Sequence, residues 1–447
     1  MLRRYLYKFI SIILLIPTIW VLFQLEFEKP SLKLMPDIKY IGKIQPLSID
    51  ISDRKTGLRK IYVGIGQNGK DKIIHSQSFP YSLLRKDRVH QVNLNLEIEP
   101  RNLGFRDGEA TLTVSVKDYS LNRFFRGNHT LIKRKVIIDT LPPRLTVLTP
   151  LNYLNQGGSG LIIYEAHEEI AQSGIRMGDL FFPGFKGKLS QKEVYLVYFA
   201  VPYNASFPIK MNLVAKDYAG NETVVEFPYH VRKKIFKKDE IQLSQDFLSK
   251  VKTRFGSKSQ SPDSPLEIFL WVNGRLRSQN HRRILEICSK THQRPLWDGP
   301  FLRMKRSKSM AGYADERTYY YNGKPVDRQV HLGIDLASTA HSPVEAANNG
   351  IVAFADDLGI YGNTIILDHG LGLFSMYGHL SNIQVTTGQK VRKGEVIGYT
   401  GSTGLAGGDH LHFSMMVSGV FVNPIEWWDR HWIQDNVVTK LRNVGRY

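Results

Sequence analysis

Residues 407–416, GGDHLHFSMM, place two histidines one residue apart at the start of an apolar run. Side chains of a β-strand alternate between its two faces, so His410 and His412 are expected on one face, with Leu411 on the other. Two imidazoles this close either share a solvated surface or converge on a common partner. The rest of the chain decides between these interpretations.

The composition is that of a globular protein. The chain has 447 residues, of which 42% are hydrophobic and 23% charged, enough for about three domains. Cys288 is the single cysteine, which excludes an internal disulfide and a zinc site built from cysteines.

The formal net charge is +19, and residues 231–310 contribute +12 of it, with 19 Lys and Arg against 7 Asp and Glu. This basic segment is either a solvated linker or a surface for nucleic acid, anionic lipid or an acidic wall polymer. No helix-turn-helix signature, finger spacing or stacking-aromatic motif is found, so no nucleic-acid partner is expected.

The first 29 residues favour a membrane anchor. Arg3, Arg4 and Lys8 precede a charge-free apolar stretch over residues 9–25, roughly the length that spans a bilayer. No small-residue cleavage site follows, so an uncleaved anchor is favoured over a signal peptide or a buried helix. We therefore expect a single-pass protein of the cell membrane, held by this helix, with the bulk exported to the periplasm or cell wall.

The following 200 residues predict a mainly β fold. Short β-branched runs are bounded by Gly, Asp, Asn or Pro. TLTVSVKDYSLN at 111–122 is echoed by KMNLVAKDYAGN at 210–221, and TGLRKIYV at 56–63 by SGIRMGDL at 173–180. Two echoes in the same order indicate a duplicated module of about a hundred residues.

The duplicated modules are placed at residues 37–142 and 143–232, and they resemble the immunoglobulin-like sandwiches of bacterial surface proteins. A protein partner for them is left open. The repeated Asp-Tyr-x-x-Asn corner is interpreted as turn chemistry. Residues 233–294 carry apolar residues at helical spacing and predict a basic helical connector. A further β-rich domain is expected over residues 295–430, followed by a tail over 431–447.

Other polar residues of the last domain suggest what the two histidines converge on. RQVHLGIDLA presents His331 and Asp335, and LGLFSMYGHLSNI presents His379. Imidazoles and a carboxylate are a typical ligand set for Zn²⁺, and a catalytic zinc ion keeps three protein ligands. With His410 and His412, five such residues exceed this number by two, leaving groups that can handle protons.

These motifs carry a family resemblance. His-x-x-x-Asp in HLGID, His-x-His in HLHF and the intervening YGNTIILDHGLGLFSMYGHL and GQKVRKGEVIGYTGSTG occur in the order found in lysostaphin-type (LytM-like) zinc metallopeptidases. The region from about Gly299 to Trp428 resembles this family.

The resemblance implies a role for each of the five residues. His331, Asp335 and His412 would hold zinc. His379 and His410 would act in catalysis, beside the metal-bound water and the scissile carbonyl.

Two further histidines and one aromatic segment are not assigned to the predicted zinc site. His369 in ILDHG and His341 in STAHSP lie at expected turns, and we interpret both as solvated. The aromatic segment YADERTYYYNGKPVDRQ at 313–329 could line a groove, or form an ordinary hairpin.

The leading functional hypothesis is a membrane-anchored, exported zinc endopeptidase that hydrolyses the peptide bridges of peptidoglycan, with the substrate class implied by the resemblance. Two alternatives stay open. One is a non-catalytic wall-binding or activator scaffold, which would be expected to lack one or more metal ligands. The other is a secreted zinc protease acting on proteins.

Overall fold

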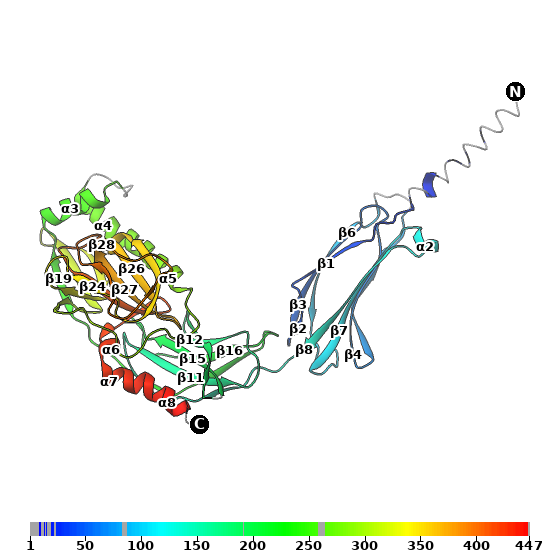
Figure 1. Cartoon of the computed structure of the whole chain (residues 1–447). Coiled ribbons are helices and arrows are strands. Elements are labelled where there is room, and N and C mark those ends of the chain that lie inside the picture. Colours follow the sequence, from blue (N-terminus) through cyan, green and yellow to red (C-terminus); the bar gives the residue numbers. More distant parts are fainter. Residues whose placement is uncertain are drawn as a thin grey trace. The chain divides into compact units, whose positions relative to one another are not determined.

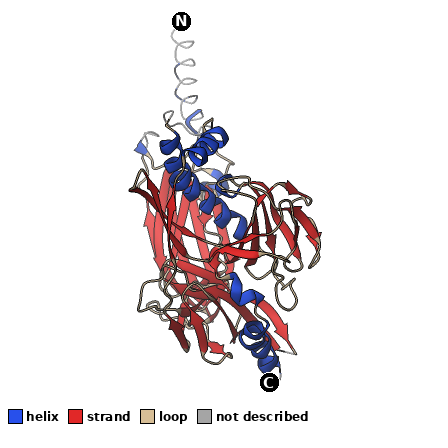
Figure 2. Cartoon of the chain, turned by 90° about the vertical axis from the view of Figure 1, so that its left-hand side faces the viewer, coloured by secondary structure: helices blue, strands red, loops and turns tan. Residues whose placement is uncertain are grey.

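The computed structural model describes residues 9, 13, 15, 19–21, 24–82, 87–190, 192–257 and 264–445, without the side chains of Arg123 and Phe125. The chain divides into two compact units. The first contains residues 1–143 with 216–222, and the second contains residues 144–215 with 223–447. Strands dominate both units, as Figure 1 and Figure 2 show, which confirms the mainly β prediction.

The first unit is built from two sheets, in the orders β1-β3-β6 and β2-β8-β7-β4-β5, with β2 and β8 parallel and the other pairs antiparallel. Its elements are β1 Ser31–Met35, β2 Tyr40–Ile41, β3 Gln45–Ser52, β4 Leu58–Gln67, β5 Lys70–Ser78, β6 Gln91–Ile98, β7 Gly108–Asp118, α2 Asn122–Phe125 and β8 His129–Ile138. Leu47, Ile49 and Ile51 alternate along β3 and are buried, so period-two alternation directs one face into the core. Immunoglobulin-like topology stays a prediction.

The second unit begins with three small sheets, in the orders β14-β15-β11-β9, β13-β12-β16-β17 and β10-β18. The strands are β9 Leu145–Val147, β10 Asn152–Asn155, β11 Ser159–Ala166, β12 Gln172–Met177, β13 Leu180–Pro183, β14 Phe185–Leu189, β15 Lys192–Ala200, β16 Asn212–Lys216, β17 Glu222–Glu226 and β18 Tyr229–Arg232. Their core continues without a break into the rest of the unit.

The remainder of the second unit surrounds a large sheet in the order β20-β23-β31-β27-β26-β25-β29, with β32 paired to β31. Smaller sheets have the orders β19-β21-β22 and β24-β30-β28. The strands are β19 Lys238–Gln242, β20 Lys308–Ala311, β21 Asp315–Tyr321, β22 Lys324–His331, β23 Ile334–Ala337, β24 Pro343–Glu345, β25 Gly350–Asp357, β26 Asn363–Asp368, β27 Leu373–Leu380, β28 Asn382–Ile383, β29 Lys390–Val391, β30 Val396–Tyr399, β31 Leu411–Val417 and β32 Val420–Val422.

Helices of the second unit gather in two places. The first group is α3 Gln245–Phe255, α4 Pro265–Trp271, the π-helical η2 Val272–Leu276 and α5 Arg277–Cys288, and the short 3-10 turn η3 Gly359–Tyr361 lies against it. The second group is α6 Pro424–Trp428, α7 Arg430–Ile433, the π-helical η4 Gln434–Val438 and α8 Thr439–Gly445.

Residues 233–294 are more than a helical linker. Phe255, Phe269 and Ile284 of this segment are buried in the core of the second unit, and β19 adds a strand parallel to β21. Apolar periodicity predicts the helices, whereas the strand pairs with residues about 80 positions away, which a local pattern does not show.

Residues 431–445, the described part of the expected tail, form helices that pack on the second unit. Figure 1 shows α7 and α8 running along the strands of residues 144–232, and α8 contacts β11 and β14. The Lys440 ammonium donates hydrogen bonds to Asn152 Oδ1 at 2.5 Å and to the Leu161 carbonyl at 3.1 Å. This packing fixes the C-terminal helices to the first half of the second unit.

The prediction of a single-pass membrane anchor over residues 1–29 has to be corrected. Among the described residues, no helix combines the length and apolar character needed to cross a bilayer, which takes about 20 residues. Most of residues 1–23 lie outside the described part. Residues 24–29 belong instead to the first unit, where Glu26 N–H donates to Ser120 Oγ at 3.2 Å and the Gln24 carbonyl accepts from Leu121 N–H.

Candidate metal centre

Three neighbouring strands bring the polar residues of the last domain together. β23 and β27 pair with opposite edges of β31, antiparallel in both cases. Asp335 of β23 is directly opposite His412, and Gly378 of β27 is opposite His412 on the other side. His379, the next residue along β27, therefore lies one position from the residue opposite His412. His331, the last residue of β22, reaches the same point across the Leu332–Gly333 turn.

His331, Asp335 and His412 form a compact triangle of ligand atoms. His331 Nε2 lies 2.9 Å from Asp335 Oδ1 and 3.0 Å from His412 Nδ1, and the last two atoms are 2.9 Å apart. Tetrahedral zinc with bonds of about 2.0–2.1 Å requires ligand separations of about 3.3 Å. The triangle needs to widen by only a few tenths of an ångström, so these three residues fit a zinc ion.

Hydrogen bonds at the far nitrogens orient both imidazoles. His331 Nδ1 is 2.7 Å from the Gly312 carbonyl, to which it donates. His412 Nε2 is 3.0 Å from Ser414 Oγ, whose hydroxyl donates to the Leu332 carbonyl. Such outer partners fix the ring orientation and leave one nitrogen of each ring for a metal.

Gly333 explains the glycine in the HLGID motif. A Cβ at this position would meet Nε2 of His412 at 2.5 Å and Ser414 Oγ at 2.7 Å. Any larger residue would push the His412 ring or its serine partner out of place.

His379 and His410 lie beside the triangle without belonging to it. Their ring centroids are 4.8 Å apart, and the His379 ring is 5.8 Å from that of His412. His379 Nδ1 donates to the Thr403 carbonyl at 2.8 Å, which leaves its Nε2 as the acceptor nitrogen. His410 Nε2 is 3.5 Å from Asp335 Oδ1.

The backbone of His379 supports this placement. Its φ of 62° lies in the left-handed region, which costs a non-glycine residue about 1–3 kcal/mol. Strain of this kind persists where the surrounding structure holds a side chain in a required position.

Charges and burial set the protonation of the cluster. Burial alone raises the pKa of Asp335, but the charge of His331 and hydrogen bonds from the histidines outweigh it, so this pKa lies well below its usual range. Burial lowers the pKa of His412 to about 4. Asp335 is therefore ionised and His412 neutral at pH 7, the forms in which each binds a metal.

The two additional histidines have pKa values displaced in opposite directions. Burial and the neighbouring charges of His410 and His412 hold the pKa of His379 well below 6.5. Burial also lowers the pKa of His410, but the hydrogen bond and charge of Asp335 outweigh this effect and raise it. One ring therefore accepts a proton poorly, and the other holds one readily.

A small cavity of about 130 Å³ opens onto all five residues. Its wall also contains Arg277, Arg317, Tyr361 and Leu405. Arg317 extends from the hairpin β21–β22, and its guanidinium lies 3.2 Å from Asp335 Oδ2. Arg317 lies in the 313–329 segment, which forms a hairpin, and no sequence motif marks it as a site residue.

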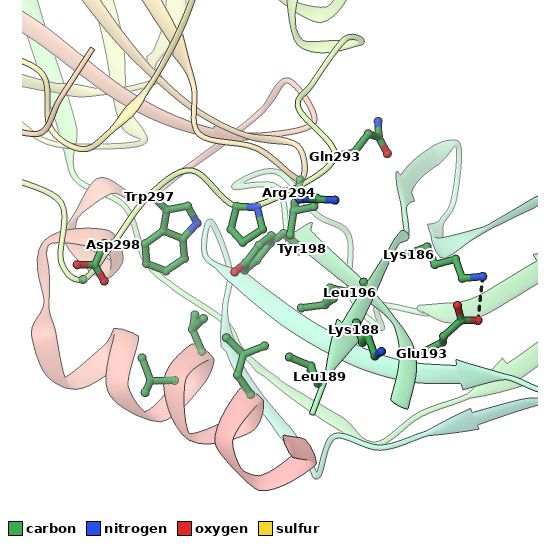
Figure 3. Close-up of a pocket in the computed structure, with 17 residues that line it drawn as sticks. Lys186, Lys188, Leu189, Glu193, Leu196, Tyr198, Gln293, Arg294, Trp297 and Asp298 are labelled. Carbon is green, nitrogen blue, oxygen red and sulfur yellow. Dashed lines mark ion pairs between the residues drawn. The ribbon is translucent and has the colours of Figure 1, made fainter. Parts of the chain in front are cut away.

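A larger cavity, of about 790 Å³, lies elsewhere in the second unit. Figure 3 shows Leu189, Leu196 and Tyr198 lining it from β14 and β15, opposite Trp297. The carboxylate of Glu193 pairs with the Lys186 ammonium at 2.9 Å on its rim. None of the five clustered residues lines this cavity, so it is separate from the metal centre.

One of the two excluded histidines is placed differently from the prediction. His341 is exposed, with 71% of its side chain accessible, as expected of a solvated residue. His369 is fully buried, with Nδ1 2.7 Å from the Asn349 carbonyl and Nε2 2.7 Å from Ser375 Oγ. A turn sequence does not reveal that other segments cover it.

Comparisons with known proteins match this part of the chain. The model of a family described as peptidase family M23 matches residues 329–424, a range that contains all five clustered residues. This match confirms the resemblance to lysostaphin-type peptidases.

Three curated relatives match over similar lengths. DD-carboxypeptidase/endopeptidase Mpg of Neisseria meningitidis serogroup B is 41% identical over 97 residues, covering 22% of each chain. Peptidoglycan DD-endopeptidase ShyA of Vibrio cholerae is 38% identical over 104 residues, 23% of this chain and 24% of the relative. Murein hydrolase activator EnvC of Escherichia coli is 35% identical over 98 residues, 22% of this chain and 23% of the relative. Each match spans less than a quarter of the relative's length.

Proposed function

Because residues 329–424 form a domain of peptidase family M23, we propose that this chain is a zinc-dependent endopeptidase that hydrolyses peptide cross-links of peptidoglycan. The observation that carries the proposal is the triangle of His331 Nε2, Asp335 Oδ1 and His412 Nδ1, with sides of 2.9–3.0 Å. The name of the relative ShyA, a peptidoglycan DD-endopeptidase, supports the substrate class.

The donor set favours zinc over other divalent ions. Two imidazoles and one carboxylate match the three protein ligands of a catalytic zinc site, whereas calcium and magnesium prefer oxygen ligands alone. Zinc held here would polarise an amide carbonyl and lower the pKa of a water molecule to about 7.

His379 and His410 supply the proton chemistry in this proposal. Neutral His379 presents Nε2 as an acceptor, because its Nδ1–H is committed to the Thr403 carbonyl. It is suited to accept a hydrogen bond from a nucleophilic water. His410 carries a raised pKa, so near neutral pH it can donate a proton or hydrogen bond to the carbonyl oxygen or the leaving amine. Neighbouring groups whose pKa values are pushed apart are typical of acid and base pairs.

The five residues are not equally exposed at the cavity. The side chains of His331 and His412 are 6% and 4% exposed, whereas those of Asp335 and His410 are 13% and 16% exposed. A substrate carbonyl entering the cavity would therefore reach His410 and Asp335 more readily than the two histidine ligands.

A second candidate function is activation of another wall hydrolase, because one relative is a murein hydrolase activator. The presence of all three metal ligands favours the enzyme, since a scaffold has no need to retain them. A zinc protease that cleaves proteins would have the same metal chemistry. Its cleavage products would distinguish it from a peptidoglycan endopeptidase.

Purified peptidoglycan distinguishes these functions. The full-length chain is incubated with sacculi, with and without a zinc chelator, and the released fragments are identified by mass spectrometry. We expect chelator-sensitive release of peptide fragments and about one equivalent of zinc per chain. His331→Ala should lose both, and His431→Ala, an exposed histidine outside the site, should lose neither.

Other outcomes would contradict the proposal. A zinc-loaded chain that releases nothing alone but accelerates a purified wall hydrolase is an activator. Cleavage of casein without any release from sacculi identifies a protease of proteins. Unchanged zinc content in His331→Ala removes this residue from the ligand set.

A further inference from the structure

A second group of buried ionisable side chains lies in the first unit, outside the peptidase domain. Glu26, Asp53 and Asp118 are 1%, 4% and 0% exposed. Each offers a carboxylate oxygen, and these oxygens all lie within 4.8 Å of one another.

The three carboxylates come from separate parts of the unit. Glu26 lies in the segment that precedes β1, Asp53 directly follows β3, and Asp118 is the last residue of β7. Because β3 and β7 belong to different sheets, the cluster joins both sheets to the entering chain.

Neutral donors hold each carboxylate in place. Thr56 donates to Glu26 Oε2 from its backbone N–H at 3.0 Å and from its hydroxyl at 2.9 Å. The Gly57 N–H donates to Asp53 Oδ2 at 2.6 Å. These contacts orient the oxygens but bring no positive charge.

Asp118 is held in the same manner. The backbone N–H groups of Ser120 and Asn128 donate to its Oδ1 at 3.0 and 2.6 Å, and the Asn128 amide donates to Oδ2 at 2.9 Å. All of its hydrogen-bond donors are uncharged.

One oxygen of the cluster has no partner. Glu26 Oε1 is buried and accepts no hydrogen bond from any described residue. A buried carboxylate oxygen that has lost water and found no donor is unfavourable unless a cation or a proton binds it. The two charges that raise the pKa of this carboxyl, after burial, belong to Asp53 and Asp118.

No ion pair holds the three carboxylates within the described part of the first unit. Within residues 24–82 and 87–143, none of them pairs with a lysine, arginine or histidine. Arg88 is a buried cation close by, but its guanidinium donates to the Thr56 carbonyl, Gln24 Oε1, the Ser82 carbonyl and Tyr81 Oη. Among the described residues, the three carboxylates therefore have no direct cationic partner.

We propose that Glu26, Asp53 and Asp118 bind one calcium ion. Hard cations prefer oxygen ligands, and calcium takes six to eight of them at about 2.3–2.6 Å. Two oxygens bound to one calcium ion can lie up to about 4.6–5.2 Å apart, a range that contains the 4.8 Å limit of the cluster. Glu26 Oε1 then gains the partner that it lacks in the protein alone.

The site has a structural role in this proposal. Its ligands join the chain before β1 to the ends of β3 and β7, so the ion links the entering segment to both sheets. Binding to the folded state alone stabilises that state in proportion to the logarithm of the ion concentration. Calcium should therefore raise the melting temperature of the first unit.

Calcium binding is measured on the full-length chain. Isothermal titration calorimetry with CaCl₂ should show one site, and scanning calorimetry should show a transition that moves up by several degrees in 1 mM CaCl₂. Glu26→Gln and Asp53→Asn should each weaken binding at least tenfold and abolish the shift. Glu97→Gln, on the exposed face of β6, is the matched control and should bind as the wild type does.

A variant in the peptidase domain separates this site from the metal centre. His412→Ala should lose zinc and keep calcium binding, whereas Glu26→Gln should keep zinc and lose calcium. The two proposals can therefore fail independently.

Several results would overturn the calcium site. One is an absence of binding to the wild-type chain up to 5 mM CaCl₂, and another is equal affinity in Glu26→Gln. Equal affinity for MgCl₂ would contradict calcium as the ion. A Glu26→Gln variant that is more stable than the wild type regardless of calcium would show that the cluster holds a proton instead. Should Glu26→Gln fail to fold, direct titration of the wild type and of Asp53→Asn still decides.

Discussion

The described residues contain two largely buried groups of three potential metal ligands, and the groups differ in ligand atoms and in surroundings. His331, Asp335 and His412 combine two nitrogens with one oxygen and border a cavity of about 130 Å³. Glu26, Asp53 and Asp118 offer oxygens alone, and they line none of the cavities described above.

If both proposals hold, the surroundings make the first group a catalytic metal site and the second a structural one. Around the first group, two further histidines and two arginines border the space that a substrate can enter. Around the second group, backbone N–H groups and small polar side chains occupy the positions next to the carboxylates. Ligand chemistry selects the ion, and access decides whether the ion can act on another molecule.

Removing a ligand from the first group should have the largest effect. His412→Ala should lose zinc and reduce peptidoglycan hydrolysis by about three orders of magnitude or more, because the metal chemistry is then absent. Metal analysis of the purified chain and fragment release from sacculi measure the two losses. Retention of zinc with full activity would mean that this triangle is not the metal centre.

Removing a histidine beside the triangle should separate catalysis from metal binding. His379→Ala and His410→Ala should keep zinc and lose activity by about 10²- to 10⁴-fold, the usual contribution of general acid or base catalysis. Zinc content and kcat for a soluble cross-linked peptide distinguish them from His412→Ala. Loss of zinc in either variant would assign that histidine to the ligand set.

A residue that touches no substrate should affect only the metal affinity. Gly333→Ala introduces a Cβ at about 2.5 Å from His412 Nε2, so the ring must move. Loss of correct ligand orientation typically costs about 10- to 100-fold in metal affinity. Competition with a zinc chelator measures this change, and activity at saturating zinc should largely recover. Gly274→Ala, where a Cβ meets no atom within 4 Å and which does not line the cavity, is the control.

The sequence was informative where the chemistry is encoded locally. The motifs HLGID and HLHF, together with His379 in LGLFSMYGHLSNI, singled out five residues that the structure places in one cluster, and period-two alternation predicted that His410 and His412 share a face. Pairing between distant segments was not encoded in this way. Arg317 reaches Asp335 because β22 turns back along β21, and His369 is buried because other segments cover its turn.

The acidic group of the first unit also could not be predicted from the sequence. Glu26, Asp53 and Asp118 are spread over 93 positions with no common motif, and Asp118 belongs to a corner that we interpreted as turn chemistry. Only the folded first unit brings them together. The apolar stretch over residues 9–25 led to a wrong prediction. Its composition suggested a membrane anchor up to residue 29, whereas residues 24–29 are part of the first unit.

Lys440 is a third site at which the protein buries an ionisable group, and it can be compared with the two groups. Its substitution should have the smallest effect of the predicted changes, on the pH dependence of stability. It is 5% exposed and bonded only to neutral oxygens among the described residues, and burial lowers its pKa from 10.5 to about 8. The unfolded chain therefore binds more protons than the folded chain between about pH 8 and 10.5, so stability should rise with pH over this range.

The rise should be on the order of 1–3 kcal/mol, since each pKa unit corresponds to about 1.4 kcal/mol. Lys440→Met should remove this pH dependence without changing zinc content or hydrolysis, because Lys440 lines neither metal group. Urea unfolding of the second unit at pH 8 and pH 10 measures the slope, with the exposed Lys324→Met as control. If the unfolding free energy of wild type and of Lys440→Met changes equally with pH, the buried ammonium keeps its proton up to pH 10. The pKa of Lys440 would then not be lowered by burial.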